Sequence, residues 1–237
     1  PERGRRWSVN AFLTVAWVFA GAALPLSVLG VSDWARTTGV GLLNMPFVSP
    51  FAALAVGFLL RSLISYLTHV AMHKVPILWR LHRVHHMDTQ LDISTTARFH
   101  PLEAIASAPI ALAGVVALGI SPLAVLLYEV FDAAIVVFSH ANVRLPNWLD
   151  RVLRLVIVTP NMHRVHHSAF QPETDSNYGA TFSFWDRLFG TYRRKAPEDM
   201  GELMLGLSEV QDRRAHNVFW QLASPLFGLA RLRRDAP

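Results

Sequence analysis

The sequence predicts an all-α integral membrane protein, with four transmembrane helices and a histidine-rich helical cap on the cytoplasmic side. Composition is the first observation: 52% of the 237 residues are hydrophobic and only 16% are charged, whereas ordinary soluble domains carry about 25% charged residues. Second, four long stretches of the chain are apolar and contain almost no charged residues. Third, ten of the eleven histidines fall between residues 69 and 167. A chain of this length is expected to form a single domain.

The apolar stretches predict membrane spans at about residues 8–31, 46–72, 104–120 and 122–139, with the cap formed by residues 73–103 and 140–237. A helix of roughly 17 to 25 apolar residues crosses the hydrocarbon layer of a bilayer. Residues 33–44 are expected to form a short connection between the first two spans. The link at Ser121-Pro122 is so short that the last two spans are expected to form a helical hairpin.

The placement of lysine and arginine predicts the topology. The N-terminus, the 74–103 loop and the chain after residue 140 are basic, whereas the loops near residues 33 and 121 are almost uncharged. Basic loops stay in the cytoplasm, so both termini and every histidine cluster are expected there. The net charge of +5 favours an anionic lipid surface as partner. It does not favour nucleic acid, because the basic residues flank apolar spans and form no recognised nucleic-acid motif.

The histidines recur at helical spacing. His69 and His73 form an H-x3-H pair, and two H-x2-HH groups follow, with single histidines between them: His82, His85, His86, His100, His140, His163, His166 and His167. Residues three and four apart share one face of a helix, and imidazole is a common metal ligand. Because a tetrahedral zinc takes only four ligands, these rings predict two metal ions with about five histidines each. A lone histidine is more often a core residue, so His216 is given no metal role.

Acidic and amide side chains near the histidines have open roles. Glu129 and Asp132 lie inside the last predicted span, where acids are costly and normally face the protein interior. They are expected to pair with Arg61, to hold histidine N–H groups or to contact a substrate. Ligating imidazoles also need their second nitrogen held. Candidates for that role, with helix capping as the competing explanation, are Asp88, Asp92, Glu103, Asn142, Asn161 and Asp175.

Two further motifs accompany the histidines. RFHPLE covers residues 98–103, and NYGATFSFWDRLFGTY covers residues 177–192. With the three histidine groups, they make residues 50–195 resemble the fatty-acid hydroxylase/sterol desaturase superfamily, whose members are integral-membrane non-haem di-iron enzymes. The resemblance implies that all ten histidines from His69 to His167 hold two iron ions, for which zinc can substitute in purified protein. Arg144 replaces a histidine of the sphingolipid-hydroxylating branch, which favours the sterol or alkylglycerol side.

The resemblance also implies a reaction and its partners. O2 would be the co-substrate, and a C–H bond of a lipid or sterol-like molecule in the bilayer would be hydroxylated or desaturated. The chain has no cytochrome b5-like or ferredoxin-like segment, so a separate donor of one of these types, with its reductase, is expected to supply electrons. Two alternatives stay open: a histidine-rich metal-binding or transport protein without redox catalysis, and an interaction protein with a structural zinc pair.

Overall fold

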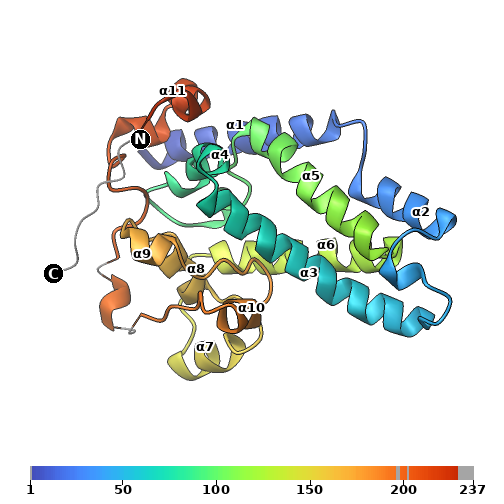
Figure 1. Ribbon diagram of the computed structural model, residues 1–237. Helices are drawn as coiled ribbons and strands as arrows, with labels where there is room; N and C mark the ends of the chain where they lie inside the picture. The colour runs from blue at the N-terminus through green and yellow to red at the C-terminus, as the bar shows by residue number, and fades with distance from the viewer. Residues whose placement is uncertain (1, 196–197, 202, 229–237) are drawn as a thin grey trace.

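The computed structural model describes residues 2–195, 198–201 and 203–228, and within these ranges the chain is helical, with three isolated bridges and no β-strand. The predicted all-α class is confirmed; the predicted cap residues 229–237 lie outside the described ranges. The α-helices are α1 (Glu2–Ala22), α2 (Val28–Thr38), α3 (Pro50–Lys74), α4 (Pro76–His86), α5 (Pro101–Leu118), α6 (Pro122–His140), α7 (Asn147–Leu153), α8 (Pro160–His166), α9 (Gln171–Thr174), α10 (Phe184–Leu188) and α11 (Val218–Ala223). The long helices form a bundle, and the short ones gather at one end of it (Figure 1).

Three helices of the described chain, α3, α5 and α6, are long and apolar enough to cross a membrane, with mean hydropathies of 1.7, 1.8 and 1.8. They correspond to the spans expected at 46–72, 104–120 and 122–139. Helix α5 ends at Leu118 and α6 begins at Pro122, so the predicted short connection is confirmed. The two helices pack against α2 and α3 and hardly touch each other, so they do not form the closely packed hairpin that was expected. The chain is therefore an integral membrane protein.

Proline fixes where several of these helices begin. Helices α3, α4, α5, α6 and α8 all carry proline in their first turn, where its missing N–H costs nothing and its fixed φ suits the helix. The residue before the proline often caps the helix: the hydroxyls of Ser49, Ser121 and Thr159 each accept a hydrogen bond from a first-turn N–H. Such caps stabilise a helix by about 1 kcal/mol each.

The first predicted span, 8–31, is wrong as a single helix. Helix α1 ends at Ala22, and α2 begins after the cap at Ser27 and continues to Thr38. Pro25 lies in the break, and a proline cannot donate the backbone hydrogen bond that a helix interior requires. The expected connection at 33–44 is accordingly helical for its first half. Helix α2 is capped at its C-terminal end by Gly39, whose φ of +74° is the left-handed conformation that glycine readily adopts.

The first turns of α1 are held in a buried polar network, which also explains why this helix differs from the three spans. Arg6 donates to Asp88 at 2.8 Å, and Asn10 donates to the same carboxylate at 2.9 Å. Arg98 donates to the Asn10 side chain at 2.6 Å and to the Val84 carbonyl at 3.0 Å. The first half of α1 serves this network, so the helix lacks the unbroken apolar length of α3, α5 and α6.

Helix direction decides which residues meet. Helices α3 and α6 both run toward the end of the bundle where the short helices gather, and α5 starts there (Figure 1). We call this the histidine end, because the last turns of α3 and α6 bring His73 and His140 to it. At the opposite end, an apolar core forms between α3, α5 and α6 from Ile64, Val115, Ile120, Ala124 and Val125.

Candidate metal centre

Nine of the ten predicted ligands converge at the histidine end in two groups. In each group, one ring nitrogen per residue lies within 4.8 Å of those of the other members. We call them group A, formed by His69, His73, His82, His86 and His166, and group B, formed by His85, His140, His163 and His167. Eight of the nine side chains are buried, and His69 is partly buried. The groups adjoin, because the rings of His86 and His167 stack with centroids 4.6 Å apart.

Each H-x2-HH motif supplies both groups. In α4, His82 and His86 are four residues apart and point into group A, whereas His85 points into group B. At α8 the assignment is reversed: His163 and His167 belong to group B and His166 to group A. Successive residues of a helix point about 100° apart, since a turn takes 3.6 residues. The paired histidines therefore diverge, and each motif bridges the two sites.

Distances between ring nitrogens fit shared cations. The Nε2 atoms of His69 and His82 are 3.1 Å apart in group A. In group B, His163 Nε2 lies 3.1 Å from the Nε2 atoms of both His140 and His167. Ligands at a metal–nitrogen distance of about 2.0–2.1 Å would be separated by roughly 3.0–3.4 Å. One imidazole nitrogen has a single proton or lone pair, so it cannot hydrogen-bond to two others at once, whereas a cation accommodates all three.

Some ring nitrogens have no protein partner. The Nε2 atoms of His86 and His166 are buried and make no hydrogen bond with the described part of the chain. A buried polar atom left unpaired costs about 1–3 kcal/mol, and a bound cation would remove that cost. Burial also lowers the pKa of His85, His86, His163 and His167 well below the usual value and that of His166 to about 3. These rings are neutral at neutral pH, which metal ligation requires.

Backbone carbonyls and one carboxylate hold the outer edge of four rings. The Nδ1 atom of His82 lies 2.7 Å from Glu103 Oε1, and three other Nδ1 atoms face carbonyl oxygens at 2.7–2.8 Å. These are His69 with Tyr178, His140 with Val136 and His166 with Ser176. An acceptor at Nδ1 places the proton there and leaves the Nε2 lone pair for a metal.

The NYG and WD motifs build the turn that supplies one of these carbonyls. Asn177 has a φ of +52°, a conformation that asparagine tolerates better than most residues. The Asp186 carboxylate then accepts hydrogen bonds from the N–H groups of Tyr178 and Gly179 at 2.7 and 2.9 Å. Trp185 donates from Nε1 to Ser62 of α3 at 3.0 Å. These contacts fix the Tyr178 carbonyl against His69.

His100 lies outside both groups. It caps α5, where its Nδ1 accepts a hydrogen bond from the Leu102 N–H at 3.1 Å, and its Nε2 faces the Leu222 carbonyl at 3.1 Å. Both ring nitrogens are therefore engaged by the protein, and neither is available to a cation. The expectation that His100 completes the ligand set is corrected on this ground. His100 occupies the N-cap position of α5, where serine, threonine, aspartate or asparagine is more usual.

Of the six acidic and amide side chains that were candidates for holding histidine rings, two lie beside a ring nitrogen and the others have different partners or none among the histidines. Glu103 holds His82, and Asp175 Oδ1 lies 3.5 Å from His73 Nδ1. Asp88 and Asp92 pair instead with Arg6 of α1. Asn142 accepts from Arg164, and Asn161 makes no hydrogen bond with a histidine in the part of the chain that the structure describes. The carbonyls of Tyr178, Ser176 and Val136 could not be read from the sequence, because every residue type carries one.

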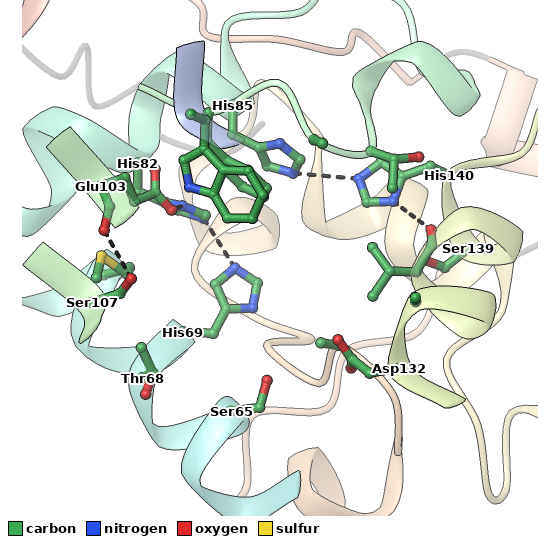
Figure 2. Close-up of a pocket in the computed structure, with 18 of the residues that line it drawn as sticks. Ser65, Thr68, His69, His82, His85, Glu103, Ser107, Asp132, Ser139 and His140 are labelled. Atoms are coloured by element: carbon green, nitrogen blue, oxygen red, sulfur yellow. Dashed lines mark hydrogen bonds and ion pairs between the residues drawn. The ribbon is translucent and has the colours of Figure 1, made fainter. Parts of the chain in front are cut away.

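A cavity of about 470 Å³ opens between the helices onto the histidines. Figure 2 shows His69, His82, His85 and His140 facing it from α3, α4 and α6. Its walls are mostly apolar, with Trp17, Phe99, Ala111, Val136 and Val137 among the lining residues. The space is suited to an apolar molecule placed beside ring nitrogens of both groups.

Comparison with known proteins agrees with this arrangement. The ornithine lipid hydroxylase OlsE of Rhizobium tropici is 31% identical over 150 residues, or 62% of this chain and 44% of that protein. The alkylglycerol monooxygenase of Caenorhabditis elegans is 30% identical over 161 residues, or 67% of this chain and 30% of that protein. A cholesterol 25-hydroxylase-like protein of Danio rerio is 28% identical over 200 residues, or 79% of this chain and 78% of that protein.

The chain thus spans less than half the length of the first two of these relatives. No solved structure matches it. The model of the fatty acid hydroxylase family matches residues 54–191, which include all nine converging histidines, the whole RFHPLE motif and all but the last residue of the second motif. The chain belongs to the fatty acid hydroxylase family.

Proposed function

We propose that this chain is a membrane-bound non-haem di-iron oxygenase that hydroxylates a C–H bond of a lipid or sterol-like substrate. The observation that carries the proposal is the pair of adjoining all-histidine groups at the end of a largely apolar cavity between membrane-spanning helices. Relatives named as lipid hydroxylases and monooxygenases favour hydroxylation over desaturation, and oxidation over metal transport.

The proposed ligands of the two iron ions are the members of groups A and B. A neutral imidazole shell suits iron, copper, zinc and nickel; the family relatives favour iron, with zinc as a substitute in purified protein. Two bound irons would supply the capacity to reduce O2 and to oxidise an unactivated C–H bond. The protein would hold the rings through Glu103 and the three carbonyls, and its cavity walls would exclude water and align the substrate.

Topology and electron supply belong to the same proposal. The basic residues flanking the spans support a cytoplasmic location for the histidine end and for both termini. Electrons for the reduction of O2 are proposed to arrive from a donor of the ferredoxin or cytochrome b5 type with its reductase.

A reconstituted assay tests the function. Iron-loaded protein in nanodiscs, with a ferredoxin and its reductase, is given 1-O-hexadecylglycerol, cholesterol or an ornithine lipid under ¹⁸O2. The expected result is O2 consumption and one ¹⁸O atom in a product found by mass spectrometry. His85→Ala is expected to abolish product while the protein remains membrane-inserted, and His216→Ala, outside both groups, is the matched control. Two bound metal ions without any oxidised product from a lipid extract would favour a structural or transport role.

A further inference from the structure

The cavity beside the histidines has a second, polar end deep between α3 and α6. Arg61, Ser65, Glu129 and Asp132 line it, and we call these four residues the polar end. Figure 2 shows Ser65 and Asp132 across the cavity from His85. Arg61 precedes His69 by eight residues, and Asp132 precedes His140 by eight. At 1.5 Å per residue, the polar end therefore lies about 12 Å from the histidines along both helices.

Contacts within the protein use only part of the polar end. Arg61 Nη2 donates to Glu129 Oε1 at 2.5 Å, and its guanidinium carbon lies 5.0 Å from the centre of the Tyr128 ring. Asp132 Oδ1 accepts from the Tyr128 hydroxyl at 2.8 Å and from the Thr181 hydroxyl. Asp132 Oδ2 and Glu129 Oε2 accept no hydrogen bond from the described chain, and the Glu129 side chain is 44% exposed. Two carboxylate oxygens thus keep free acceptor capacity.

Charge and depth limit what these acceptors can bind. The polar end has two carboxyl groups and one guanidinium, and this guanidinium already donates to Glu129, so a substrate carboxylate would meet an excess of carboxyl groups. Arg61 is the twelfth of the 25 residues of α3, which places the polar end near mid-membrane. Bringing a charged headgroup to that depth costs several kcal/mol, whereas a hydroxyl that gains a hydrogen bond costs far less.

We propose that the polar end anchors an uncharged hydroxyl group of the substrate, which donates a hydrogen bond to Asp132 Oδ2. The inference rests on the proposed function and adds to it a substrate class: an apolar alcohol, not a free fatty acid. With the oxygen anchored there, the apolar part of the molecule extends toward His69, His85 and His140. The oxidised carbon then lies within about 12 Å of the anchored oxygen.

Binding without turnover tests this anchor independently of catalysis. Purified full chain in nanodiscs, with no reductant, is labelled by a sixteen-carbon alcohol that carries a photoreactive diazirine at mid-chain. Unlabelled 1-hexadecanol, hexadecyl methyl ether, palmitate and hexadecylamine compete. 1-Hexadecanol is expected to compete at about tenfold lower concentration than the ether or the acid, the effect of one hydrogen bond. Labelled peptides are expected to include cavity residues such as Phe99 or Val136.

Variants locate the contact. Asp132→Leu removes the acceptor Oδ2 and is therefore expected to remove the preference for alcohol over ether. Tyr128 and Thr181 can still hydrogen-bond to each other at 3.0 Å, so the variant does not leave their hydroxyls unpaired. Ser107→Ala, which removes a cavity hydroxyl already bonded to the Glu103 carbonyl, is expected to leave the preference intact. Equal competition by the ether, stronger competition by palmitate or hexadecylamine, or labelling outside the cavity would each overturn the anchor. If Asp132→Leu does not fold, the competitor series on the native protein decides alone.

Discussion

His82 of α4 and Glu103 in the first turn of α5 are joined by a contact of 2.7 Å between Nδ1 and Oε1. It is the one carboxylate contact below 3 Å to a member of either histidine group in the described chain. The contact connects a proposed metal ligand to the start of a membrane-spanning helix. It therefore couples the orientation of group A to the packing of α5.

Replacing Glu103 should weaken metal binding in group A. Loss of an acceptor that holds a ligating histidine typically lowers metal affinity about 10- to 100-fold. Glu103→Ala is expected to show this loss, and Glu103→Gln a smaller one, because its amide oxygen can still accept from Nδ1. Competition with a chelator measures the affinity. Glu209→Gln, which lies outside both groups, should leave it unchanged; an equal loss there would point to a general effect on folding.

Single ligand changes should separate the two metal sites. His86 belongs to group A and its neighbour His85 to group B, so His86→Ala and His85→Ala each remove one ligand from a different site. Elemental analysis of metal per chain is expected to fall from two toward one in both variants. The double variant should fall further, toward zero. A double variant no worse than either single one would show that the nine rings hold a single ion.

Acid should destabilise the metal-free protein. The pKa of His85, His86, His163 and His167 is lowered by burial, and that of His166 falls to about 3. Below the ordinary pKa of about 6.5, the unfolded chain binds protons that the folded chain does not. Stability is therefore fully present above pH 6.5 and is lost as the pH falls below it, by up to about 1.4 kcal/mol per pH unit for each ring.

Thermal unfolding of the metal-free protein between pH 8 and pH 5 checks this prediction. The melting temperature should be nearly constant above pH 7 and fall steeply below pH 6.5. His166→Gln should flatten the fall, because it removes one group that must bind a proton on unfolding. A melting temperature that rises on acidification would contradict the buried, neutral state of these rings.

The network around Asp88 should contribute more to stability than an exposed ion pair. Asp88 accepts from Arg6, Asn10 and Thr95 in the buried interior. Asp88→Asn leaves Arg6 with less compensation, at a cost of about 3 kcal/mol. The matched control is Asp33→Asn, whose partner Arg36 and own side chain are 55% and 58% exposed, for an expected cost below about 1 kcal/mol. Melting temperatures in one detergent compare the two variants.

Local pattern was sufficient for several features of this protein. Runs of apolar residues predicted the three long spans, and Ser121-Pro122 marked the link before α6. Histidine spacing predicted a two-ion site, and nine of the ten named rings converge. Apolar composition continues across Pro25, so composition alone does not reveal that the first predicted span breaks into α1 and α2 there. The role of His100 as a helix cap is likewise hidden, because a histidine that caps a helix has no distinguishing spacing.

By itself, the sequence determined which side chains can bind a metal and which segments can enter a bilayer, since both depend on residue type and helical period. Only the tertiary structure decided how the rings divide between two groups, because that depends on the angles at which α3, α4, α6 and α8 meet. It also decided which backbone carbonyls hold the rings and where Arg61, Glu129 and Asp132 lie around the cavity. Such contacts join residues far apart in the chain, and no local pattern encodes them.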